Sequence, residues 1–396
     1  MVSPSLVRGF WFPTRPITLQ PWTGRPDGPG VYFTPGLIGN PETVAIPFTR
    51  AGDGVVRIQY DPEATVERLV TEAYEPERRP WHSHLPVPSA WIPAPAREAL
   101  LRWSIAPRLR RPGFPRWPTE PLVENIRAVV RAAEAATGTR SAPEPLWPAD
   151  LGWAAALSHD FDSPGAFRGE RWKALAEIEE AYGLRSSWHV CSEHLPAALP
   201  ALEALAARGH EIGWHGPRHN YRFAFQTRER IRLEAAGMME RLAAFGVRGF
   251  RSPNFLRTPA LYAGLDGVLG YDSSARDTAA ELFGGPGRRG CCTVFPFFRG
   301  GLLELPVTVP DDLSIRCLHG DDSGRIAAVQ LEKLDWIRSN HGMALVLTHP
   351  ETWISLTPGA LRAYRRLVET IAADPSAWRA LPREIESWWR SRTPPA

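Results

Sequence analysis

Short apolar runs and longer amphipathic segments alternate along the chain from about residue 151. The short runs are typical of buried strands, and the longer segments place apolar residues at the spacing of amphipathic helices. The expected strands are 153–160, 185–190, 210–215, 247–253, 302–309 and 344–350. The expected helices are 171–184, 199–209, 228–246, 258–270, 327–342 and 358–374. This alternation indicates β-α-β units and a parallel sheet, and six or seven such units favour a barrel over an open sheet.

The first part of the chain has a different pattern, with many prolines and tryptophans and few regular periods. The expected elements there are a strand at 54–60 and helices at 65–74 and 124–138, the second ending in a glycine. The segment 84–96 is expected to be extended because prolines interrupt it. We therefore expect an α/β protein with an N-terminal accessory region over 1–145, of mixed α/β structure and unknown function, and a barrel over 146–396.

Composition and charge narrow the class of protein. Of 396 residues, 43% are hydrophobic and 22% are charged, which predicts a packed core. The net charge is +3, and the densest basic stretch, 108–116, is broken by prolines, so we expect no nucleic-acid partner. That stretch is either a solvated surface patch or a contact for phosphate groups.

Apolar runs and cysteines indicate the cellular compartment in which the protein is expected. No run of about 18 apolar residues occurs, and the first residues lack the apolar core of a signal peptide. The four cysteines, at 191, 291, 292 and 317, form no paired motif. We therefore expect a cytoplasmic protein with reduced thiols and no transmembrane segment.

Polar residues occur directly after several of the expected strands. The carboxyl ends of the strands in a parallel barrel meet on one face, where catalytic groups lie, so these side chains are expected to share one pocket. The residues are Asp160, Asp162, His215, His219, Arg251 and His349.

Two histidines and one carboxylate are the usual protein ligands of a catalytic zinc-type ion. His215 and His219 are four residues apart, but Gly216 and Pro217 between them indicate a loop instead of a helix. One of the two acids at 160 and 162 would supply the carboxylate, and the other would be a general base. Each motif also has an ordinary interpretation, such as solvated loop acids or a core histidine, and the joint placement after successive strands favours the metal site.

Four short motifs, HDFD at 159–162, HGPRH at 215–219, RSP at 251–253 and LTH at 347–349, resemble the motif series of the polysaccharide deacetylase family. This family is the NodB-homology domain, or carbohydrate esterase family four. The resemblance covers about 151–373, and GFRSP, YDSS and LLELPVT further resemble its branch in bacterial surface-glycan pathways. The resemblance implies a distorted (β/α)7 barrel and one bound divalent metal ion. Zinc is the expected metal, and cobalt, nickel or manganese are alternatives.

The resemblance also implies roles for individual residues. The catalytic roles would be Asp160 as base, Arg251 as the cation that keeps this base ionised, His349 as the acid that protonates the leaving amine, and Asp272 as the acid that tunes His349. The metal ligands would be Asp162, His215 and His219.

The chain departs from the family pattern in two places. Phe161 separates two acids that are usually adjacent, so the roles of Asp160 and Asp162 could be exchanged, and Asn254 stands where an aromatic residue is usual. His159 has no fixed family role and either supports a metal ligand or is an ordinary strand-end histidine.

Together these features predict a metal-dependent hydrolase that removes an N-acyl group, most simply acetyl, from an amino sugar or glycan precursor. A small-molecule amidohydrolase or deformylase on the same barrel is the first alternative. A non-catalytic carbohydrate-binding protein, with some of the 16 tryptophans as sugar platforms, is the second. The oligomeric state is left open, and a dimer is one possibility.

Overall fold

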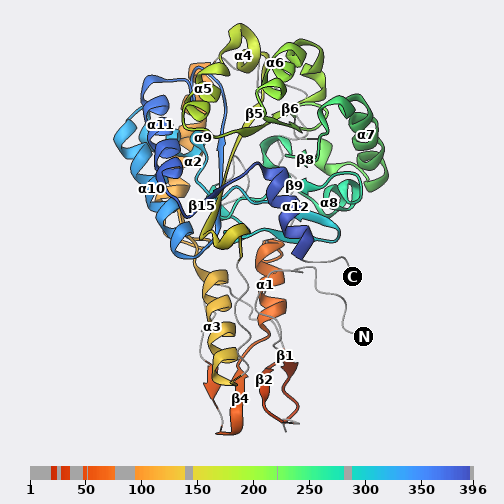
Figure 1. Ribbon diagram of the computed structural model, residues 1–396, viewed down its shortest axis with the longest axis vertical. Helices are drawn as coiled ribbons and strands as arrows, with labels where there is room; N and C mark the ends of the chain where they lie inside the picture. Colours follow the sequence, from red (N-terminus) through yellow and green to blue (C-terminus); the bar gives the residue numbers. More distant parts are fainter. Residues whose placement is uncertain are drawn as a thin grey trace.

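A curled parallel sheet organises the larger part of the molecule (Figure 1). The computed structural model describes residues 19–24, 28–35, 48–50, 52–75, 94–138, 146–220, 222–280 and 288–392. The parallel strands are β5 (Trp153–Phe161), β6 (Ser186–Val190), β7 (Glu211–Trp214), β8 (Gly249–Phe250), β9 (Tyr271–Asp272), β13 (Leu302–Glu304) and β14 (Met343–Thr348). Every residue of β5 is buried, because side chains from the barrel interior and from the outer helices cover its two faces.

The strand order is β12-β13-β9-β8-β7-β6-β5-β14, where β12 (Phe297–Arg299) runs antiparallel to β13. An additional strand, β15 (Ala377–Arg379), pairs with the start of β5. The sheet curls so that the segment after β13 reaches β14, and the amides of Thr308 and Val309 donate to the carbonyl oxygen of Leu345 at 3.2 and 3.3 Å. The predicted α/β fold class, a distorted barrel with an accessory region, is confirmed.

Helices surround the sheet and match most of the predicted ones. They are α5 (Lys173–Ala181), α6 (Leu195–Ala207), α7 (Arg228–Arg241), α8 (Pro259–Leu265), α10 (Ser323–Ser339) and α11 (Pro358–Ala373). The sequence pattern did not predict α9 (Asp312–His319) or α12 (Pro382–Arg392). The strand predicted at 302–309 ends after Glu304, and Pro306 cannot donate a ladder hydrogen bond.

The accessory region forms a small sheet with two helices packed on it. The sheet has the order β1-β2-β4-β3, with β1 (Leu19–Pro21), β2 (Gly30–Phe33), β3 (Phe48–Arg50) and β4 (Val55–Ile58). The helices are α1 (Pro62–Val70) and α3 (Leu122–Ala136). In Figure 1 these helices lie between the accessory sheet and the barrel. The predicted glycine at the end of the second helix is Gly138, which has φ +77° and follows the C-cap Thr137.

The boundary near residue 145 stays a prediction, because side chains cross it in both directions. The helix α2 (Ala94–Arg110) packs on α9, where Leu101 and Ile105 join the cluster that contains Cys317. Conversely, Cys291 and Phe297 belong to the core of the accessory region. The segment 84–96 was predicted to be extended. Residues 84–93 lie outside the described residues, and residues 94–96 are the first three residues of α2.

All four cysteines are free and buried, as expected for structural thiols. Across the ranges that the structure describes, no helix is long and apolar enough to cross a membrane. The basic stretch 108–116 is partly engaged: Arg110 donates to the carbonyl oxygen of Leu318 at 3.5 Å, and the amide of Arg116 donates to Glu120 at 2.8 Å.

Candidate metal centre

The end of β5 places both acids on the inner side of the barrel. Side chains alternate across a strand, so the residue between two inward-facing residues must face outward. Phe161 does so, since its buried ring packs 5.8 Å from the ring of Phe167 and 5.3 Å from that of Trp188, measured between centroids. The spacing that departs from the family pattern therefore lets Asp160 and Asp162 both face the interior.

Asp162, His215 and His219 form a compact group of possible ligand atoms. The Oδ1 atom of Asp162 lies 3.2 Å from Nε2 of His215 and 3.4 Å from Nε2 of His219. Gly216 adopts φ +78°, which a residue with a Cβ rarely adopts, and this turn brings the second histidine back toward the first. The loop predicted between the histidines is therefore what allows both rings to face one carboxylate.

Two buried atoms of this group lack hydrogen-bond partners. The Nδ1 atom of His215 lies 2.8 Å from the carbonyl oxygen of Arg251, so Nδ1 carries the hydrogen and Nε2 is left as an acceptor. Within the described part of the chain, neither this Nε2 nor Oδ1 of Asp162 has a hydrogen-bond partner. Two acceptors facing each other in this way fit a bound cation, which would satisfy both.

The electrostatics of the group favour ionised acids. Burial alone would raise the pKa of Asp162, but the neighbouring His219 and His349 outweigh it and hold this pKa far below its usual range. Burial would lower the pKa of His215, but Asp160 and Asp162 raise it above its ordinary value. A proton and a cation therefore compete for His215, so cation binding should weaken in acid.

Asp160 is held by a fully buried arginine. The guanidinium of Arg251 donates from Nη1 to Oδ1 of Asp160 at 2.8 Å. Its other hydrogen bonds, from Nη2 to the hydroxyls of Ser158 and Ser273 and from Nε to the carbonyl oxygen of Ser273, span 2.9 to 3.0 Å and fix its position. Burial would raise the pKa of Asp160, but Arg251 and then His215 outweigh it, so the carboxylate is ionised.

His349 follows β14 and is oriented by Asp312, the first residue of α9. Its Nδ1 atom and its backbone amide lie 2.7 Å from the two carboxylate oxygens of Asp312. Its Nε2 atom lies 3.7 Å from Oδ2 of Asp162, on the inner side of the barrel. Burial would lower the pKa of His349, but Asp312 and Asp162 hold it well above its ordinary value.

The prediction that Asp272 tunes His349 needs correction. Asp272 accepts hydrogen bonds from the amide and hydroxyl of Ser274, at 3.0 and 2.7 Å, instead of contacting His349. Asp312 takes the place beside His349 because it begins α9, a helix that the sequence pattern did not predict. The pair Asp311-Asp312, before an apolar segment, was the available signal for a helix start.

Two further histidines lie close to Asp160 in the chain or in space. His159 faces the outer helices, with Nε2 2.6 Å from Oε1 of Glu179 and Nδ1 2.7 Å from the hydroxyl of Thr348. It is therefore the strand-end histidine of the two interpretations, because its hydrogen-bond partners are Glu179 and Thr348 and not a candidate ligand.

His189, which the sequence analysis missed, pairs with Asp160 across β5 and β6 and places Nδ1 3.6 Å from its Oδ1. Neither ring nitrogen has a hydrogen-bond partner among the described residues, and burial lowers the pKa to about 3, so the ring is neutral. Gly213 makes room for it, because a Cβ there would lie 2.3 Å from Cδ2 of His189. The alternation of Ser187 and His189 in the predicted strand was the available signal for an inward-facing polar side.

The structure thus brings together every predicted site residue except Asp272. The groups from β5, the loops after β7 and β8, and the end of β14 converge on one face of the barrel. The assembled chemistry comprises a possible cation site, an ionised carboxylate beside it and a histidine held by a second carboxylate. The roles of these residues stay predictions.

Comparison with known proteins gives matches only at the level of structure. No protein family model and no curated protein matches the chain. A Mycobacterium smegmatis protein described as a polysaccharide deacetylase aligns with a TM-score of 0.51 and 19% identity, over 64% of this chain and 95% of that one. A Pseudomonas aeruginosa PAO1 protein described in the same way aligns at 0.51 and 13%, over 65% and 97%. The PuuE allantoinase aligns at 0.50 and 13%, over 65% and 96%.

These alignments cover nearly the whole length of each neighbour, and the structural superposition shows a common fold despite the low sequence identity. The resemblance first seen in the short motifs is thereby confirmed for the fold, whereas the surface-glycan branch stays a prediction. The chain has the barrel fold of the polysaccharide deacetylases.

Proposed function

We propose that this protein is a metal-dependent hydrolase that removes an N-acyl group, most simply acetyl, from an amino sugar or glycan precursor. One observation carries the proposal: unpaired buried acceptors on Asp162 and His215 lie beside the arginine-held carboxylate of Asp160. Unpaired acceptors that face each other in this way are unusual in a structural ion-pair network, since buried polar groups are normally satisfied.

Asp162, His215 and His219 would hold the cation. Two imidazoles and one carboxylate suit zinc, and cobalt, nickel or manganese remain alternatives. The bound ion would supply Lewis-acid chemistry, polarising the acyl carbonyl group and lowering the pKa of water.

Asp160 would accept the proton of the attacking water. A general base must be ionised and close to the reacting atoms. Arg251 keeps Asp160 ionised, and its four hydrogen bonds prevent the carboxylate from turning away. His189, neutral and in van der Waals distance of this carboxylate, would limit its movement on the other side.

His349 would protonate the nitrogen that leaves. An amide anion is a poor leaving group near neutral pH, so breakage of the carbon–nitrogen bond needs a proton donor. Asp312 fixes the ring through Nδ1 and so leaves Nε2, which faces Asp162, to deliver the proton. The protonated nitrogen then leaves as a free amine, and the acyl group leaves as a carboxylate.

A ring-opening or small-molecule amidohydrolase is the second candidate, because an allantoinase shares the fold. The same base, acid and cation ligands would hydrolyse a cyclic amide, and the fold does not decide between the two substrates. A purely carbohydrate-binding role would not require the intact base and acid. We also propose a cytoplasmic location, for which the four free cysteines are the supporting observation.

The test is a substrate screen on metal-loaded protein. N-acetylated amino sugars, their nucleotide derivatives and lipid-linked forms would be assayed for released acetate, beside allantoin and N-formyl compounds for the alternative. Asp160→Asn would serve as the inactive control. Acetate release that disappears in this variant supports the proposal, and ring opening of allantoin without acetate release favours the second candidate. Full metal loading with no hydrolysis of any compound would contradict both.

A further inference from the structure

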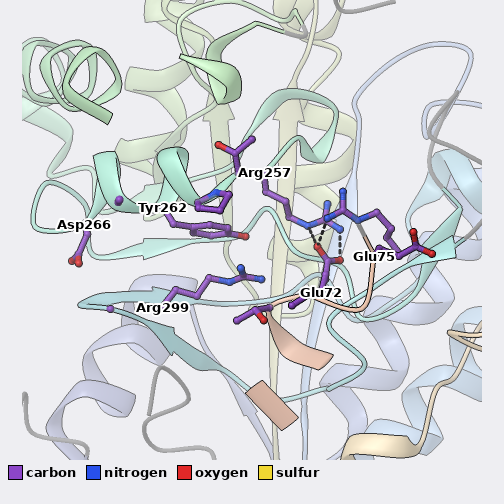
Figure 2. A pocket seen from close by; sticks show the side chains of 13 residues that line it. Glu72, Glu75, Arg257, Tyr262, Asp266 and Arg299 are labelled. Carbon is purple, nitrogen blue, oxygen red and sulfur yellow. Dashed lines mark hydrogen bonds and ion pairs between the residues drawn. The ribbon is translucent and has the colours of Figure 1, made fainter. Parts of the chain in front are cut away.

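A pocket lies where the accessory region meets the barrel, apart from the candidate metal centre, and an inference about it does not depend on the proposed function. Its volume is about 570 Å³, within the range of small-molecule sites. The walls come from the segment that follows α1, from α8 and the loop before it, from β11 (Arg288–Arg289) and from the end of β12. Figure 2 shows Arg257, Arg299 and Tyr262 around its centre. None of its lining residues belongs to the candidate metal centre.

A buried carboxylate anchors the arginines of this pocket. Glu72 is 2% exposed and accepts a forked pair of hydrogen bonds from Nε and Nη2 of Arg257, the first at 2.6 Å. Arg289 donates to the same carboxylate at 3.4 Å. Burial would raise the pKa of Glu72, but Arg257, Arg289 and Arg299 outweigh it and lower the pKa to about 2. Two guanidinium groups thus contact one buried carboxylate, and the charge of Arg299 acts on it from a greater distance.

The remaining acids of the pocket lie at its ends. In Figure 2, Asp266 and Glu75 flank the pocket on opposite sides of the arginines. Asp266 accepts a hydrogen bond from the amide of Gly301 at 3.0 Å. Glu72 forms ion pairs with Arg257 and Arg289, whereas among the described residues no ion pair joins an acid to Arg299, so the charge of Arg299 is the one not neutralised by direct contact.

The unpaired atoms in this pocket are hydrogen-bond donors. Tyr262 is 7% exposed, and its hydroxyl has no partner among the described residues. The Nε atoms of Arg289 and Arg299 are buried and also lack partners there. The guanidinium carbon of Arg299 lies 4.1 Å from the centre of the Tyr262 ring, so the two side chains form one surface. A ligand that satisfies these groups must present several acceptor oxygens.

We propose that this pocket binds a phosphorylated small molecule of about the size of a sugar phosphate. Arginine forks match the oxygen geometry of phosphate, and the hydroxyl of Tyr262 adds a donor from the side of α8. The volume exceeds that of a phosphate ion alone, so the remainder accommodates the body of the ligand. The ligand would contact both the accessory region and the barrel.

Binding is tested on the full chain by isothermal titration calorimetry. The probes are glucose 6-phosphate, inorganic phosphate, glucuronate and glucose, which separate a phosphate ester from the free ion, from a carboxylate and from the neutral sugar. We expect glucose 6-phosphate to bind most tightly and glucose not to bind. Absence of binding of both phosphate probes at millimolar concentration, or tighter binding of glucuronate, would overturn the proposal.

Tyr262→Phe separates a binding role from a structural one. The hydroxyl is buried without a partner, so its removal should leave the melting temperature of the free protein unchanged or raise it. The affinity for glucose 6-phosphate should fall by about 3- to 10-fold, the usual loss for one hydrogen bond. Tyr182→Phe, on the far side of the barrel at the end of α5, is the matched control and should change neither.

A second variant tests the role of Arg299 independently of Tyr262. Arg299→Gln should weaken binding at least about 10-fold because it removes a charged donor. Arg299 also donates to the carbonyl oxygen of Val70 at 2.8 Å, so this variant could destabilise the junction, whereas Tyr262→Phe could not. Unchanged affinity in the folded Tyr262→Phe protein would reject this assignment of the pocket.

Discussion

Two buried arginine–carboxylate pairs, Arg251 with Asp160 and Arg257 with Glu72, use arginines from one short segment of the chain but carboxylates from different regions. In both pairs burial would raise the pKa of the acid, and the arginine contributes most to lowering it instead. They differ in what surrounds them. Around Asp160 the unpaired buried atoms include the acceptors of Asp162 and His215, whereas around Glu72 they are the donors of arginine and tyrosine side chains.

The ion pair by itself therefore says little about function, and the unpaired neighbours say more. Acceptors that converge without a donor fit a cation, and donors that converge without an acceptor fit an oxyanion. Both inferences rest on the rule that buried polar groups are seldom left unsatisfied. The experiments below test whether the two centres differ in this way.

The largest effect is expected from removing both histidine ligands. His215→Ala/His219→Ala should reduce bound metal from one equivalent to background and lower turnover at least about 1,000-fold, since the ion contributes several kcal/mol to the transition state. Mass spectrometry of the metal content and acetate release measure the two effects. His319→Ala, at the end of α9, is the control. A full equivalent of metal in the double variant would refute the assignment of these ligands.

Breaking the second pair should affect stability instead. Glu72→Gln removes the buried carboxylate that Arg257 and Arg289 share, so the free energy of unfolding should fall by about 3–5 kcal/mol. Urea denaturation followed by fluorescence measures this change. Glu75→Gln, at the end of the same pocket, should stay within about 0.5 kcal/mol of the parent protein. Equal effects of the two substitutions would show that the buried pair does not stabilise the junction.

Substitutions of Asp160 and Asp162 should have different effects on metal content and on turnover. Asp160→Asn should keep its metal and lose at least about 100-fold in turnover, the usual scale for a general base. Asp162→Asn should lose metal affinity first, because it removes a ligand. The opposite result, with a metal-free Asp160→Asn protein, would mean that the two roles are exchanged.

A third buried acid, Glu211, extends the comparison because no arginine side chain of the described residues donates a hydrogen bond to it. Glu211 accepts hydrogen bonds from the hydroxyl of Tyr271 at 2.9 Å and from the amide of Arg383 at 3.0 Å. Burial is the largest influence, and it raises the pKa from 4.5 to about 7 despite these contacts. Between pH 4.5 and about 7, the folded protein therefore keeps a proton on Glu211 that the unfolded chain has already lost.

This stabilisation is complete below the unfolded pKa and is lost as the pH rises toward 7. The loss from this group should be about 1–3 kcal/mol between pH 4.5 and 8. Glu211→Gln stays neutral and should remove that part of the pH dependence, as measured by denaturation at several pH values. Glu203→Gln, on the exposed side of α6, is the control and should retain the parent's dependence. Retention of the full dependence in Glu211→Gln would assign it to other groups.

Periodic segments of the sequence predicted most of the barrel. The strands at 153–160 and 344–350 and the long helices after 171 were recognisable because their side chains repeat with a local period. The elements missed were short or mixed, such as α9 and β15, whose formation depends on what they pack against. The accessory sheet was visible only as one β-like stretch, since its other described strands are three or four residues long.

The sequence by itself determined which residue types follow which strands, and hence the candidate ligands, base and acid. Only the tertiary structure decided that Asp312, instead of Asp272, supports His349 and that His189 lies beside Asp160. It alone also showed that the segment after α1 lies beside α8 and lines a pocket with it, apart from the metal centre. The physical reason is that a strand's period is local, whereas contacts between distant segments depend on how the whole sheet curls and which helices cover it.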